Sequence, residues 1–239
     1  MRLDRFLSNM GVLTRSQCKK EVRGGMISVN GAVAQKSDLS IDPDKDEIRY
    51  RGELIEYQRY TYLMLNKPKG YISATDDPSK KTVLDLIDGR FAARELFPCG
   101  RLDIDTTGLL ILTNDGKLAH ALLSPKHHVQ KTYRFTCDLP LPEDSPERVA
   151  EGLVLDDGYE CLRAELVLDA DGCGGRITLC EGKFHQIKRM VKTLGSTVLE
   201  LERKSFGGIA KSPRDPSGRT GGCVESIPSN HRFIGKRTL

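Results

Sequence analysis

The segment best suited to chemistry is a glycine-bounded stretch, GRLDIDTTGLL, at residues 100–110. It places Asp103 and Asp105 two residues apart, close to the guanidinium of Arg101 and just before an apolar run typical of a buried strand. A carboxylate in such a loop can serve as a nucleophile or as an acid or base, and a nearby cation would keep it ionised. Taken alone, an aspartate-rich loop is more often a turn or a cap.

The elements that must position this loop are predicted to be mainly strands. Apolar or alternating runs predict them at 62–65, 109–113, 132–139, 164–168, 176–179 and 198–201. Helices are predicted at 117–123 and 184–194, the second with an apolar stripe and Gly195 at its C-terminal end. Because strands outnumber helices and many neighbours look hairpin-connected, the fold class is α+β, with a mixed, mostly antiparallel sheet and a central cleft.

A smaller α/β module is predicted to precede this domain. Apolar residues at helical spacing predict a first helix that Gly11 ends, and Thr14 or Ser16 can cap a second helix running to about Arg23. Asn30-Gly31 between two short strands is a tight-hairpin signal. The module is predicted to span residues 1–58 and the larger domain residues 60–235, with the link near 57–61.

Basic residues are concentrated at the two ends of the chain. The net charge is +4, but residues 1–36 carry seven Lys/Arg against two Asp/Glu, and residues 203–239 carry eight against two. On the second helix, Arg15, Lys19 and Arg23 fall on one face, with Lys20 beside them. Basic ends fit a polyanionic partner, although charge alone fits a solvated surface equally well.

Several classes of protein are disfavoured by composition. No apolar stretch approaches the roughly 18 residues of a membrane helix, and the N-terminal segment is not expected to be a signal peptide. The seven cysteines are an odd number with no CxxC pair, which favours a reduced cytoplasmic protein without a zinc site. No heptad or large apolar patch argues for a dimer, so a monomer is expected.

Four ordered motifs are similar to those of one enzyme family. GRLDIDTTGLL resembles the catalytic motif of the pseudouridine synthases, in particular the ribosomal small-subunit pseudouridine synthase A family. NKPKG at 66–70, KTY at 131–133 and EGKFHQIKRM at 181–190 resemble its other motifs. RLDRFLS at 2–8, TRSQCKKEVRGG at 14–25 and VNG at 29–31 look like the S4 RNA-binding domain that commonly precedes that catalytic domain.

The resemblance implies roles for individual residues. Asp103 would be the catalytic carboxylate, and Lys188 would be the cationic partner of Asp103, with Arg189 as the alternative. Tyr133 would be the active-site tyrosine. Asp105 is expected to be structural, bonding the loop backbone or Thr107. RNA contacts are expected from several basic residues: Arg101, which would help to flip the target base, and Lys67, His185, Arg189, Arg15, Lys19, Lys20 and Arg23.

The implied reaction converts one uridine of small-subunit (16S) ribosomal RNA to pseudouridine. It involves no redox change or net hydrolysis, so neither a metal nor any other cofactor is expected. Two alternatives remain: a 23S enzyme of the same wider family, and a non-catalytic RNA-binding or ribosome-assembly protein that uses the S4-like module. After residue 210 the basic, Gly-, Pro- and Ser-rich ending departs from the family pattern.

Overall fold

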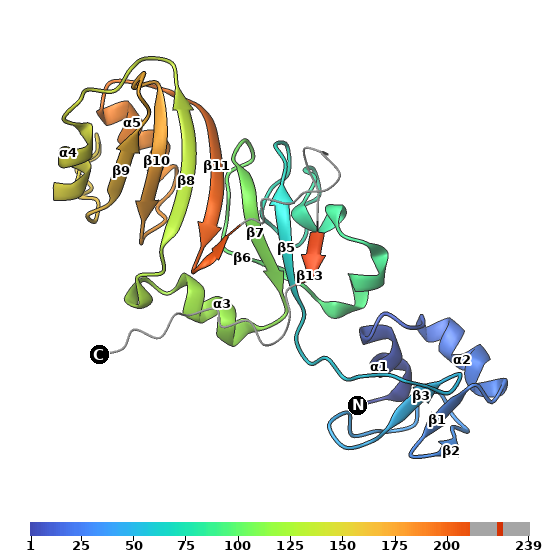
Figure 1. The fold of residues 1–239 in the computed structure, drawn as a ribbon. Helices are drawn as coiled ribbons and strands as arrows, with labels where there is room; N and C mark the ends of the chain where they lie inside the picture. Colours follow the sequence, from blue (N-terminus) through green and yellow to red (C-terminus); the bar gives the residue numbers. More distant parts are fainter. Residues whose placement is uncertain (211–223, 227–239) are drawn as a thin grey trace. The chain divides into compact units, whose positions relative to one another are not determined.

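The computed structural model describes residues 1–210 and 224–226 (Figure 1), so most of the atypical ending lies outside the described residues. The chain divides into two compact units. The first contains residues 1–61 together with 87–96, and the second contains 62–86 and the described residues from 97 onward. The sequence predicted the link near 57–61, but it did not suggest that residues 87–96 belong with the first unit.

The first unit packs two helices against a small antiparallel sheet. Its elements are α1 (Leu3–Asn9), α2 (Arg15–Arg23), β1 (Ile27–Val29), β2 (Ala32–Val33), β3 (Ile48–Tyr50) and β4 (Glu53–Leu54), with strand order β2-β1-β3-β4. Thr14 caps α2 reciprocally with Gln17, while Asn30 and Gly31 both have positive φ, as the predicted tight turn requires. The apolar sides of both helices are buried, so the basic side of α2 is left exposed.

The segment 87–96 is held to the first unit by a buried arginine. Within the short 3₁₀ helix η2 (Gly89–Arg94), Arg94 is 8% exposed and donates from Nη1 to the carbonyl of Gln58 at 2.9 Å. Its other amino group, Nη2, lies 3.9 Å from the sulfur of Met10. A charged side chain gives no signal of such packing in the sequence.

The second unit is built on one mixed sheet. Its strands are β5 (Tyr62–Lys67), β6 (Phe97–Cys99), β7 (Thr107–Thr113), β8 (Lys131–Cys137), β9 (Glu165–Leu168), β10 (Gly174–Leu179), β11 (Val198–Phe206), β12 (Ile209–Ala210) and β13 (Val224–Ser226). The main order is β13-β5-β7-β11-β8-β10-β9, with β6 on β7 and β12 on β11. Among the described strands only β7 and β11 pair in parallel, which matches the predicted mostly antiparallel sheet.

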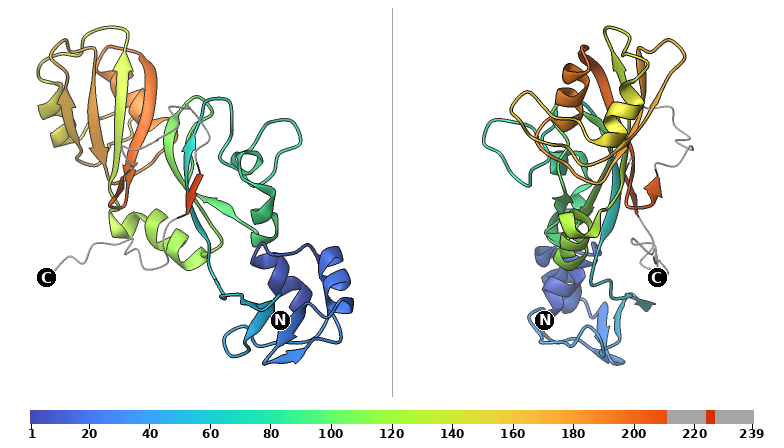
Figure 2. Two further views of the ribbon diagram at one scale, coloured as in Figure 1. Left: turned by 45° about the vertical axis from the view of Figure 1, so that its right-hand side comes forward. Right: turned by 90° about the vertical axis from the view of Figure 1, so that its left-hand side faces the viewer.

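Among its described residues, the second unit also contains three α-helices and two 3₁₀ helices. They are α3 (Gly116–Leu123), α4 (Ser145–Glu151), α5 (Gln186–Thr193), η1 (Val83–Leu86) and η3 (Pro125–His127). Figure 2 shows α4 (yellow) and α5 (orange) beside the strands of the β8–β11 part of the sheet. The buried side chains of these strands, including Phe135, Ile177 and Leu201, share one face by their register. No described helix is both long and apolar enough to cross a membrane.

The contact between β7 and β11 is unusually close. Gly108 has φ +101°, and a Cβ there would lie 2.3 Å from the carbonyl oxygen of Arg203. Only glycine fits this backbone approach. The result is that the loop entering β7 is placed beside the middle of β11.

The C-terminal helix differs from its prediction at its start. The expected helix 184–194 begins only at Gln186, because His185 adopts a left-handed conformation with φ 50°. Phe184 and His185 therefore form an irregular turn before α5. Helix α4 was not predicted from the sequence. Only two of its residues are buried, Ser145 and Val149, so it has no apolar stripe at helical spacing.

Candidate active site

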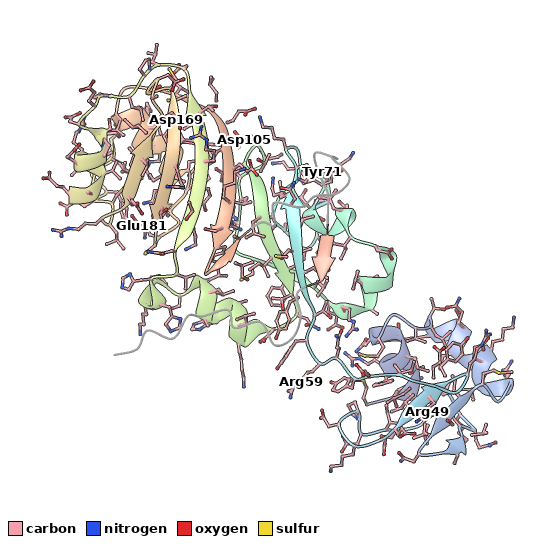
Figure 3. All side chains as sticks on the ribbon, viewed as in Figure 1. Arg49, Arg59, Tyr71, Asp105, Asp169 and Glu181 are labelled. Carbon is pink, nitrogen blue, oxygen red and sulfur yellow. The ribbon has the colours of Figure 1, made fainter. Side chains whose placement is uncertain are left out.

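The loop at residues 100–106, termed here the Asp103 loop, connects β6 to β7. It is fastened to the segment that follows β5 by backbone and side-chain bonds. Gly70 donates its amide to the carbonyl of Ile104 at 2.8 Å, and the Ser73 hydroxyl bonds both the amide and the carbonyl of Leu102 at 3.0 Å. Figure 3 shows Asp105 and Tyr71 at the same end of the β5–β7 pair. Two segments distant in sequence thus fix one loop.

Lys67 lies beneath this loop rather than on the surface. Its side chain is 0% exposed, and Nζ donates to the carbonyls of Thr106 at 2.8 Å, Pro68 at 3.0 Å and Ile104 at 3.4 Å. Burial lowers the pKa of Lys67 to about 8, although the charges of Asp105 and Asp103 oppose the shift. The assignment of Lys67 to RNA contact is corrected, because an enclosed ammonium whose three protons are used internally cannot reach a phosphate.

Lys188 approaches both carboxylates of the loop. Its Nζ lies 3.4 Å from an oxygen of Asp103 and 2.6 and 2.8 Å from the two oxygens of Asp105. Burial raises the pKa of Asp105, but the hydrogen bond and charge of Lys188 outweigh it and leave that pKa lowered. Asp105 was expected to bond the loop backbone or Thr107. Its carboxylate does interact with its own backbone amide, but its short side-chain hydrogen bonds go to Lys188.

The alternative cation is directed elsewhere. Arg189 forms an ion pair with Asp157, in the segment between α4 and β9. One position on a helix turns a side chain by about 100°, so the neighbours Lys188 and Arg189 cannot both face the Asp103 loop. Of these two cations, the structure brings Lys188 to Asp103.

Asp103 lies at a cavity formed by the Asp103 loop, the sheet and the turn before α5. Tyr133 on β8 is 8% exposed and lines this cavity. The other lining residues include Arg101 from the Asp103 loop itself and Leu179, Lys183, His185, Ile187, Lys188 and Leu201. The Asp103 side chain is 29% exposed, and His185 Nε2 lies 3.7 Å from its Oδ1. Thr106, which the sequence did not single out, also lines the cavity with a buried hydroxyl.

This arrangement combines an accessible carboxylate, a cation, an aromatic ring and apolar walls. The ammonium of Lys188 presents an opposite charge 3.4 Å from the carboxylate of Asp103. Tyr133, Leu179 and Leu201 offer flat or apolar surface to a planar ring. The site can therefore hold a planar heterocycle beside a carboxylate, as required for chemistry on a nucleoside.

The remaining predicted basic residues belong to the first unit. Arg15, Lys19, Lys20 and Arg23 are all exposed on α2. In the described part of the chain no cluster of His, Cys, Asp and Glu has the makings of a metal site.

Both units of the chain match known protein families. Residues 61–193 match the RNA pseudouridylate synthase family model, and residues 1–46 match the S4 domain. The chain is 39% identical to the uncharacterized RNA pseudouridine synthase YtzG of Bacillus subtilis, over 89% of this chain and 90% of that protein. It is 38% identical to ribosomal small subunit pseudouridine synthase A of Escherichia coli K12, over 87% and 90% of the two chains.

A solved structure supports the same conclusion. The crystal structure of a pseudouridylate synthase with 35% sequence identity covers 95% of this chain and 96% of its own, with a TM-score of 0.64. Family models, relatives and fold agree over both units. The chain is therefore a member of the RNA pseudouridine synthases, in the family of ribosomal small subunit pseudouridine synthase A, with an N-terminal S4 domain.

Proposed function

We propose that the protein isomerises one uridine of small-subunit (16S) ribosomal RNA to pseudouridine, with Asp103 as the catalytic carboxylate. The observation that carries the proposal is the convergence of Asp103, Lys188 and Tyr133 on one cavity, 3.4 Å separating the lysine from the aspartate. Similarity to the small-subunit enzymes supports the choice of RNA.

The reaction breaks the N1–C1′ bond of uridine and forms a C5–C1′ bond. The proton on C5 is lost and N1 gains one, so the product is an isomer and no oxidant or reductant is consumed. Asp103 can attack C1′, add to C6, or assist elimination across C1′–C2′. Each route uses the ionised carboxylate, beside which the ammonium of Lys188 lies.

The target base must leave its stack before the carboxylate can reach it. Arg101 is exposed at the entrance of the Asp103 loop, where a guanidinium can occupy the space that the base vacates or bind the adjacent phosphate. Tyr133 forms the inner wall, where its ring can stack on the extruded uracil and its hydroxyl can assist proton transfer.

The test is to incubate the protein with 16S and 23S transcripts and to map pseudouridine chemically at nucleotide resolution. We expect one modified uridine in the 16S transcript. Modification of the 23S transcript alone would overturn the proposed substrate, and modification of neither, as free RNA or as assembling subunits, would overturn the proposed activity.

The charge of Lys188 gives a pH-dependent prediction. Lys188→Met should lower kcat by about 10-fold or more and move the acidic limb of the pH–rate profile to higher pH, because a carboxyl group without its cation is protonated more readily. Lys188→Arg, which keeps the charge in a different geometry, should retain much of the rate.

Arg189→Met is the matched control for this pair of variants. Because Arg189 is paired with Asp157, its loss should leave the acidic limb in place. If Arg189→Met shifts the limb and Lys188→Met does not, the partner has been assigned wrongly. If neither variant shifts it, Arg101 becomes the first candidate.

The basic face of α2 gives a prediction about binding. Replacing Arg15, Lys19 and Arg23 together by Ala should weaken binding to 16S RNA and reduce the slope of log K against log salt by about 2–3, at about 0.7–0.9 per phosphate contact. The measurement is a salt titration of affinity. Turnover should persist at high RNA concentration, because the second unit is unchanged.

A control with the same charge change separates this face from net charge. Lys36, Lys45 and Arg59 are exposed in the same unit but lie outside α2. Their replacement by Ala should leave the salt slope close to that of the wild type. Equal slopes for the two triple variants would show that α2 is not the RNA-binding face.

A further inference from the structure

The turn before α5 carries an aromatic ring that the proposed chemistry does not use. Phe184 is 72% exposed, more than any other large apolar side chain in the described residues. Its ring stacks on the imidazole of His185, with centroids 3.8 Å apart and an interplanar angle of 18°. A single exposed apolar residue is ordinary on a protein surface, so its position must carry the argument.

The ring lies at the edge of the active-site cavity. His185, against which it stacks, has its Nε2 3.7 Å from Oδ1 of Asp103. The residues on both sides of Phe184, Lys183 and His185, line the cavity with Asp103 and Tyr133. Phe184 thus stacks directly on the imidazole that approaches the proposed catalytic carboxylate.

The turn is built to hold this ring in place. Glu181 accepts hydrogen bonds from Gln186 Nε2 at 2.5 Å, the Tyr159 hydroxyl at 2.7 Å and the Leu162 amide at 2.8 Å. The amide of Lys183 donates to Gln186 Oε1 at 3.0 Å, and Gln186 is 4% exposed. Figure 3 shows Glu181 just past the end of β10.

The backbone at this turn is also unfavourable for the residue it holds. His185 has φ 50°, a conformation that costs free energy in a residue other than glycine and that persists only where the surroundings enforce it. Because of this conformation, α5 begins only at Gln186 and Phe184 lies outside the helix. The hydrogen bonds of Glu181 and Gln186 therefore hold the turn in this unfavourable conformation, and the turn leaves the ring of Phe184 exposed.

The surroundings of the ring fit a nucleic acid. Lys183 is exposed beside it, and the cavity edge also carries Arg101 and Lys188. Cations interleaved with an aromatic ring are the arrangement by which proteins bind single-stranded RNA, with phosphates on the cations and a base on the ring. Extrusion of the target uridine leaves its neighbour in the strand without a stacking partner.

We propose that Phe184 stacks on the nucleobase adjacent to the extruded uridine and so helps to determine which RNA segment the site accepts. The proposal rests on the proposed function, because it assumes that RNA enters the cavity at Asp103. The base is read by its π-face, so this contact selects an unstacked neighbour rather than a particular base.

Tryptophan fluorescence gives a direct test, because the chain contains no tryptophan. Phe184→Trp introduces a single reporter at the ring. We expect binding of the 16S transcript to quench its emission, as stacking on a base does. Leu139→Trp is the control: position 139 is 57% exposed and follows β8 at the end remote from Tyr133. Its emission should change little.

Kinetics separate stacking from mere apolar contact. Phe184→Leu should raise KM by about 5- to 100-fold with kcat nearly unchanged, since the lost contact exists in both ground and transition states. Phe184→Tyr should restore KM to within about threefold of the wild type. Circular dichroism of each variant establishes that the fold is retained.

The outcomes distinguish this proposal from the function on which it rests. If the wild type modifies 16S RNA and Phe184→Trp binds that RNA without quenching, stacking is wrong while the function stands. Equal KM values for the Leu and wild-type proteins would also overturn it, and would leave Phe184 free for a protein partner. If the wild type modifies neither transcript, the proposed function fails first.

Discussion

Asp103→Asn should lower the rate of pseudouridine formation by at least about 10³-fold while leaving the affinity for RNA within a few-fold of the wild type. The amide has the shape of the carboxylate but neither its charge nor its nucleophilicity. Asp103 is 29% exposed and is not part of the buried core, so the fold should tolerate the change. Single-turnover assays on the 16S transcript, with binding measured in parallel, are the appropriate measurements.

Asp105→Asn is the matched control two residues away. It removes the negative charge closest to Lys188 but keeps an amide oxygen that can still accept from Nζ, so Asp103 becomes the one carboxylate beside that ammonium. We expect a smaller loss, in RNA positioning or loop stability, with turnover still measurable. Turnover near the wild-type level for Asp103→Asn, or loss of all turnover for Asp105→Asn alone, would contradict the assignment of Asp103.

Lys67→Met should have the largest effect on stability. The change leaves the carbonyls of Pro68, Ile104 and Thr106 without the ammonium that bonds them inside the protein. Loss of one partner from a buried polar group is costly, and we expect the free energy of unfolding to fall by about 3 kcal/mol. Turnover should fall as well, because the same bonds position the Asp103 loop.

The nearby Lys69 provides the control for that variant. Its side chain is 52% exposed, with Glu200 3.7 Å away, so Lys69→Met should change the free energy of unfolding by less than about 0.5 kcal/mol. Equal stability of the Lys67→Met and wild-type proteins in urea unfolding would show that the three bonds do not hold the loop.

The pH dependence of this difference has a definite sign. The pKa of Lys67 is lowered by burial to about 8, against about 10.4 for a lysine in an unfolded chain. Between these values the unfolded state binds more protons than the folded state, so this group makes the stability of the wild type rise with pH. The free energy of unfolding of the wild type, relative to that of Lys67→Met, should therefore rise from pH 8 towards pH 10.

Local patterns were sufficient for most elements because nearest neighbours determine them. Alternation predicted the strand around β8, the Gly-rich run 169–175 predicted the hairpin of β9 and β10, and Asn30-Gly31 predicted the turn between β1 and β2. Residues 87–96 were not assigned to the first unit, since Arg94 is buried by contacts with Gln58 and Met10 that no local pattern encodes. The start of α5 was placed too early because an apolar periodicity does not report the left-handed backbone at His185.

The burial of Lys67 was indicated by the alternation of its strand, but its charge led to the opposite expectation. It follows Leu63 and Leu65 on the same face of β5, and both leucines are buried. The alternation therefore placed Lys67 on the inner face, whereas its charge suggested the surface. Three backbone carbonyls supplied by the folded chain make that burial possible, and the sequence of the strand does not reveal them.

The sequence by itself determined the family, the order of the two units and a loop that presents Asp103 before a buried strand, because motifs and strand patterns are local. Only the tertiary structure decided which charges meet. Lys188 reaches Asp103 and Asp105 across more than 80 residues, while its neighbour Arg189 pairs with Asp157. Such pairs depend on the parallel contact of β7 with β11 and on the rotation of α5, which packing of the whole sheet sets.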